Sequence, residues 1–199
     1  MSMNGTITGF AVGDTIGLDG ITVTGSNYSG GVLTLTEAVG GPVTLNLPGT
    51  FAADRIGVAN LPGGGAILSL RRTLSWIGGG GSAFGVAATW NDLTSGLNPA
   101  ATPPSVVDTA RFNVGGAVTG PGTIAALEVG LTGSGGLRLS GGARIVAGSL
   151  DAGVGAADVG QINLSGAGTD LAVSGDATVA DAGTGVMWVL NGPPSPPRA

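Results

Sequence analysis

Residues 164–185 read LSGAGTDLAVSGDATVADAGTG and carry the strongest signal of secondary structure in the chain. Short runs in which apolar side chains recur stand between glycine turns, which is typical of short β-strands. Residues 131–143, LTGSGGLRLSGGA, show the same pattern at an offset of about 33 to 34 residues. A fixed repeat of short strands and tight turns indicates a β-solenoid, because no single copy can bury its own apolar face.

The two copies predict how the solenoid is built. We expect an all-β chain whose repeats form a right-handed parallel β-helix, with about six rungs of about 20 residues and a length of about 30 Å at about 4.8 Å per rung. If the copies stack as matching rungs, Leu137 and Leu171 face one interior column, and Ile145 and Val179 face another. Thr178 then points outward.

The first third of the chain predicts a different β arrangement. Residues 32–36, VLTLT, and residues 43–47, VTLNL, alternate apolar and polar side chains around Gly-Gly-Pro, which favours a β-hairpin with one buried face. Further strands are expected at residues 14–18, 21–24 and 66–70, the first two around a turn at Asp19-Gly20.

Glycine- and proline-rich segments divide the chain. Residues 62–65 read PGGG and mark a break before the solenoid, and residues 193–197 read PPSPP. We therefore expect a β-rich segment with a hairpin at 1–72, a solenoid at 73–191, and a proline-rich disordered tail at 192–199.

The composition excludes several kinds of site. The 199 residues include 41 glycines, and the chain has no histidine, lysine or cysteine. Catalytic dyads that need histidine or lysine, thiol nucleophiles, disulfides and zinc sites are thereby ruled out. A net charge of -5 argues against nucleic-acid binding, and no apolar run is long enough for a membrane span. The sequence predicts no catalytic, cofactor-binding or metal-binding residue.

The repeat resembles that of bacterial autotransporter passenger domains, the type V secretion and PEP-CTERM-associated repeat. Residues 164–185 carry the closest likeness, and Ala180 stands where that family usually has glycine. Trp76, Trp90 and residues 104–112 resemble the opening of such passengers, so the likeness covers residues 73–191. It implies a non-enzymatic structural or adhesive β-solenoid.

The N-terminal segment resembles the "GDTIDL" units of very large bacterial secreted proteins. The likeness lies in residues 7–18, 31–35 and 45–49, with Gly17 where the family usually has aspartate. Both resemblances imply an extracellular or cell-surface module, a fragment of a larger protein, whose partner is a host or matrix glycan or protein. An uncapped last rung also predicts end-to-end self-association.

Two acidic features offer alternatives. Residues 165–173 partly match the calcium-binding nonapeptide of β-roll proteins at Gly166, Gly168 and Asp170, but a structural turn is favoured because the earlier copy lacks the aspartate. A carbohydrate-active β-helix, a lyase or hydrolase, is the alternative function. Its catalytic pair would come from the following carboxylates: Asp151, Asp158, Asp170, Asp176 and Asp181.

The tryptophans and one glycine pattern could be ligand sites, but for most of them a structural role is expected. Trp76 and Trp90 are expected to plug the end of the solenoid core, whereas Trp188 stays open as a sugar-stacking platform. Residues 120–125 fit the loose dinucleotide pattern G-x-G-x-x-A, but no helix is predicted after them, as that motif requires.

Overall fold

The chain is nearly all β-structure and divides into two compact units. The computed structural model describes residues 2–49, 51 and 55–190, and the predicted tail at 192–199 lies outside them. Strands make up 53% of the structure, which confirms the all-β prediction. The units are Met1–Arg72 and Thr73–Ala199.

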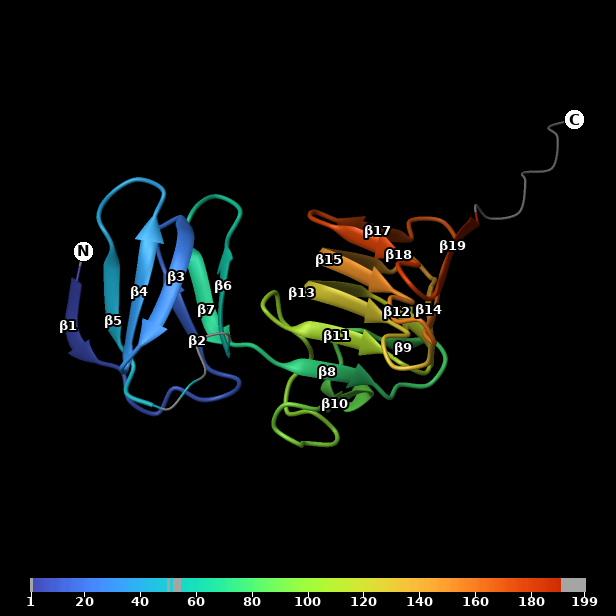
Figure 1. Ribbon diagram of the computed structural model, residues 1–199, viewed down its shortest axis with the longest axis horizontal. Coiled ribbons are helices and arrows are strands. Elements are labelled where there is room, and N and C mark those ends of the chain that lie inside the picture. The colour runs from blue at the N-terminus through green and yellow to red at the C-terminus, as the bar shows by residue number, and fades with distance from the viewer. Residues whose placement is uncertain (1, 50, 52–54, 191–199) are drawn as a thin grey trace, which may run out of the picture. The chain divides into compact units, whose positions relative to one another are not determined.

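The first unit holds two sheets (Figure 1). One sheet has the order β1-β5-β4-β3, from strands β1 (Ser2–Thr6), β5 (Val43–Asn46), β4 (Val32–Glu37) and β3 (Val23–Ser29). The other has the order β2-β7-β6, from β2 (Thr15–Leu18), β7 (Ala66–Leu70) and β6 (Ile56–Asn60). The predicted hairpin is the antiparallel pair β4–β5.

The turn at Asp19-Gly20 connects two sheets. Strands β2 and β3 belong to different sheets, so the two strands around this turn do not pair with each other. The buried side chains of the two sheets together form one apolar core, which includes Leu33, Leu45 and Leu68. The amide of Asn60 fastens the sheets, because it accepts from the Val23 backbone NH at 2.8 Å and donates to the Val23 carbonyl at 2.9 Å.

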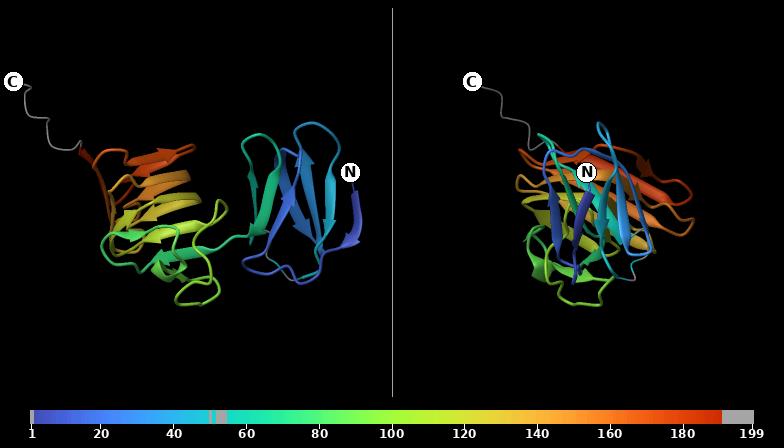
Figure 2. Two further views of the ribbon diagram at one scale, coloured as in Figure 1. Left: turned by 180° about the vertical axis from the view of Figure 1, so that it is seen from behind. Right: turned by 90° about the vertical axis from the view of Figure 1, so that its left-hand side faces the viewer.

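The second unit is a β-solenoid, as predicted. One ladder of parallel strands has the order β8-β11-β13-β15-β17, and β18 also pairs with β15. A second parallel ladder has the order β9-β12-β14-β16-β19. Figure 2 shows the strands stacked above one another as rungs.

The strands of the first ladder are β8 (Thr73–Trp76), β11 (Thr109–Phe112), β13 (Pro121–Val129), β15 (Arg144–Ala152), β17 (Asp170–Val173) and β18 (Ala177–Val179). Those of the second are β9 (Ser82–Ala83), β12 (Gly115–Thr119), β14 (Ser134–Leu139), β16 (Val159–Ser165) and β19 (Thr184–Leu190). A short 3-10 helix (Ala87–Thr89) leads into β10 (Trp90–Asp92).

The predicted spacing of the rungs was wrong. Leu137 lies beside Ile162 in the next rung, not beside Leu171, and Leu139 lies beside Leu164. Ile145 lies beside Leu171. The solenoid has about three turns instead of about six rungs of about 20 residues.

The second expected column was wrong for the same reason. Val179 lies beside Ala152, not beside Ile145. Strand β14 belongs to one ladder and β17 to the other. The comparison of the two sequence copies therefore superposed strands of different ladders, which have similar glycine turns beside them, and not strands of two successive rungs. Thr178 lies beside Asp151 and is half-buried.

The two ends of the described solenoid differ. At the first rung β10 pairs antiparallel with β8, and Trp76 and Trp90 close the core. At the last rung the core columns open to solvent. Met187 is 40% exposed beside the fully buried Ile162, and Val189 is 67% exposed beside Leu164.

Candidate functional site

Trp76 and Trp90 are core residues, as predicted. Both are buried, and their rings meet edge to face at 5.0 Å between centroids. The Trp90 indole NH donates to the Phe84 carbonyl at 2.8 Å, and Phe112 stacks on Trp76 at 5.5 Å. These rings stabilise the closed end of the solenoid and are not available to a ligand.

Trp188 has the opposite environment. Its side chain is 43% exposed on β19, at the edge of the second ladder. The strand register places it beside Asn163, Asn163 beside Arg138, and Arg138 beside Ala117. Alternate residues of these strands, such as Ile162 and Leu137, are buried in the core. The column that ends at Trp188 therefore faces outward.

A hollow lies along this outward column. It has a volume of about 310 Å³, and its lining includes Gly115 and Gly136 together with Arg138, Gln161, Asn163 and Trp188. Gly115, Gly136 and Gln161 are successive neighbours in register, so they form a second outward column beside the first. The two columns thus place the indole ring of Trp188, two side-chain amides and the Arg138 guanidinium around two glycines that have no side chain.

Comparisons with known proteins give this site no precedent. No family model, characterised protein or solved structure matches the chain. Among the residues described, no helix has both the length and the apolar character needed to span a membrane.

The five aspartates proposed as catalytic are dispersed. Asp158 accepts from the backbone NH groups of Gly133 at 2.7 Å and Gly155 at 3.0 Å, so it shapes a turn between rungs. Asp176 and Asp181 are exposed in loops flanking β18. Asp170 begins β17, also exposed. The structure does not bring these carboxylates into one site.

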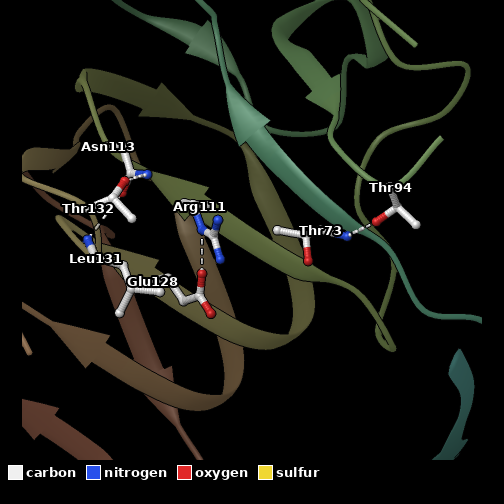
Figure 3. Close-up of polar contacts among 7 residues, drawn as sticks. All are labelled: Thr73, Thr94, Arg111, Asn113, Glu128, Leu131 and Thr132. Carbon is white, nitrogen blue, oxygen red and sulfur yellow. Dashed lines mark hydrogen bonds and ion pairs between the residues drawn. The ribbon is translucent and has the colours of Figure 1, made fainter. Parts of the chain in front are cut away.

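Asp151 has a carboxylate neighbour that the sequence argument missed. Glu128 on β13 lies beside Asp151 on β15, and on its other side it lies beside Arg111 on β11. The Arg111 Nε donates to the Glu128 carboxylate at 2.6 Å, and both side chains are about one fifth exposed (Figure 3). Glu128 and Asp151 are 23 positions apart (128 and 151), so only the true register could have paired them.

The motifs with ligand patterns fall in structural elements. Gly166 and Gly168 have positive φ values of 92° and 74°, as expected of a tight turn, and Asp170 is exposed. In the described part of the chain, no three acidic side chains gather as they would around a metal ion. Gly120 is followed by strand β13, not by the helix that a dinucleotide motif requires.

Proposed function

We propose that this chain is a non-enzymatic adhesive or structural module of a secreted or cell-surface bacterial protein, like an autotransporter passenger. The β-solenoid itself supports the proposal, since such folds offer long, rigid outward surfaces for recognition. The passenger-like repeat at 164–185 contains β17 and β18 of the first ladder, together with the end of β16 and the start of β19 in the second ladder, whose outward face carries the hollow.

One observation carries the adhesive function: a ligand-sized hollow on a rigid sheet with an exposed tryptophan at its rim. Aromatic side chains and arginine are among the residues most enriched at recognition surfaces. Trp188 and Arg138 flank Asn163 in the outward column. The partner class that follows is a surface ligand, a host or matrix glycan or protein.

Retention without turnover is the test of this function. The purified full chain is passed over immobilised polysaccharides and matrix proteins, and the same polysaccharides are assayed for reducing ends and unsaturated products. We expect retention on at least one ligand and no product. Turnover that disappears when one carboxylate is replaced would refute the adhesive reading.

The neighbouring carboxylates favour one alternative, a carbohydrate-active β-helix enzyme. Adjacent parallel strands lie about 4.8 Å apart, and retaining glycosidases hold their two carboxyl groups about 5–5.5 Å apart. Glu128 and Asp151 occupy such neighbouring strands. The ion pair to Arg111 occupies Glu128, which favours a structural role for it. Product formation that is lost in both Glu128→Gln and Asp151→Asn would establish the enzyme instead.

A further inference from the structure

Two glycines on the outward face have no structural reason to be glycine. Gly115 and Gly136 are stacked neighbours within β12 and β14, and neither has a positive φ. A Cβ atom on Gly115 would meet nothing within 4 Å, and one on Gly136 would lie in ordinary contact, 3.7 Å from the Gly115 Cα. Glycine inside a strand weakens it and often marks a bulge, a tight bend, or close approach by a ligand or another backbone.

Their neighbours show the contrast. A Cβ on Gly135 would collide with the backbone of Gly130, and one on Gly160 would lie 2.5 Å from the Val129 carbonyl oxygen. Those glycines are required for the rungs to stack. Gly115 and Gly136 are not, and what their missing side chains leave open is the floor of the hollow.

The walls of the hollow hold polar groups that have no partner among the residues that the structure describes. The Asn163 amide oxygen is buried and accepts no hydrogen bond from the described residues. In that same part of the chain, the exposed Arg138 guanidinium pairs with no carboxylate. A buried acceptor without a donor costs free energy, and rotation of the Asn163 amide toward the hollow would let a ligand hydroxyl donate to it.

These groups define a ligand by its chemistry. A pyranose ring has an apolar face that fits an indole such as Trp188, and its hydroxyl groups can both donate to and accept from the amides of Asn163 and Gln161. The guanidinium of Arg138 matches a carboxylate, which it can bind through two parallel hydrogen bonds. A volume of about 310 Å³ lies at the small end of ligand sites and suits a short stretch of sugar rings.

We propose that the hollow between β12, β14, β16 and β19 binds an acidic polysaccharide, with a uronic acid ring on Trp188, its hydroxyls on Asn163 and Gln161, and its carboxylate on Arg138. The glycines at 115 and 136 let the chain of sugars approach the sheet. The inference rests on the proposed adhesive function and names the ligand class for it.

The test measures binding of the full chain to oligogalacturonate and to a neutral cello-oligosaccharide of equal length by calorimetry. Gly136→Val fills the hollow without strain, since β-branched residues suit strands. We expect Gly136→Val and Trp188→Ala to weaken oligogalacturonate binding at least about tenfold, equivalent to about 1.4 kcal/mol. Arg138→Gln should abolish the preference for the acidic over the neutral oligosaccharide.

Gly17→Val is the matched control. Gly17 also lies within a strand, in the first unit, and a Cβ there would meet nothing within 4 Å. We expect this variant to bind like the parent. The unfolding midpoint of Gly136→Val should equal or exceed that of the parent, which separates lost binding from lost folding.

Three outcomes would overturn the inference. Equal binding of the neutral and acidic oligosaccharides would remove the role of Arg138, and undiminished binding by Gly136→Val would place the site elsewhere. Binding to a matrix protein with no binding to either oligosaccharide would overturn the glycan inference while the adhesive function stands. Turnover of a polysaccharide would refute the adhesive function itself.

Discussion

One corner of the solenoid repeats three times, and the third copy breaks the glycine pattern. Gly130, Gly153 and Ala180 have φ values of 62°, 62° and 61°. Each donates its backbone NH to a carbonyl of the preceding rung, Phe112, Val129 and Ala152 respectively, at 2.9 to 3.0 Å. Ala180 is the one non-glycine residue with positive φ among those described. Opposite exchanges at Gly153 and Ala180 should therefore have opposite effects.

The magnitudes follow from the backbone and from the space above each residue. The left-handed conformation costs an L-residue about 1–2 kcal/mol, and alanine recovers about 0.4–1 kcal/mol through the unfolded chain. Ala180→Gly should thus stabilise the solenoid by about 0.5–1 kcal/mol. Gly153→Ala pays the conformational cost and also overpacks, because its Cβ would collide with the Thr184 carbonyl. We expect it to destabilise by about 2–4 kcal/mol.

Tryptophan fluorescence reads this unit alone, since Trp76, Trp90 and Trp188 all follow the division at Arg72. The measurement is the free energy of unfolding in urea, followed by the emission of the full chain. Gly141→Ala is the control for Gly153→Ala. Gly141 has the same φ of 62°, but a Cβ there would only touch a methyl group at 3.6 Å.

The two exchanges should change the stability of the solenoid in opposite directions. If Ala180→Gly destabilises the solenoid as Gly153→Ala does, the three corners are not equivalent. If Gly153→Ala costs no more than Gly141→Ala, the close approach of the next rung at Thr184 does not constrain this position.

Three further predictions concern the core, the glycine turns and the last rung. Ile145→Asp should lower the free energy of unfolding by several kcal/mol because Ile145 is buried, whereas Val146→Asp, at a side chain 44% exposed, should lower it by about 1 kcal/mol or less, the difference in strand propensity; urea midpoints compare the two. Millimolar calcium should leave the melting temperature within about 1 °C, because Asp170 is an exposed residue at the start of β17 that belongs to no cluster of three acidic side chains among the described residues, and a clear rise would revive the β-roll interpretation. Sedimentation should show end-to-end association of two molecules through the exposed edge of β19, and it should increase with protein concentration. Salt should also increase it, since salt screens the repulsion between the exposed carboxylates of Asp176 and Asp181 on one molecule and those on the other. A monomer at every salt concentration would contradict this prediction.

Local patterns in the sequence were sufficient for the strands and the turns. The β4–β5 hairpin, the strand β7 and the buried pair of tryptophans follow from alternation, turn residues and ring size. Ala180 stood out in the sequence as a departure from the repeat, and it proves to carry the exceptional φ. These features depend on a few neighbouring residues, so a single sequence contains them.

Register could not be predicted in the same way. Similar glycine turns occur at corners of both ladders, so the strongest self-similarity aligned β14 with β17 instead of β14 with β16. Contacts between residues of different rungs could therefore not be predicted either. The pairing of Glu128 with Arg111 and the alignment of Arg138 with Asn163 and Trp188 both join residues of different rungs.

The hollow could not be predicted for a different reason: the sequence does not show what a side chain at each glycine would contact. In a chain with 41 glycines, composition treats each one as a turn former or a strand breaker. The structure separates them by what a side chain would meet. At Gly153 or Gly160 a Cβ collides with backbone, so those residues maintain the stacking of rungs. At Gly115 a Cβ meets open space and at Gly136 it makes only ordinary contact, both in extended strands where a β-branched residue would stabilise the sheet better. Folding alone gives no reason for glycine there, and close approach of a ligand does.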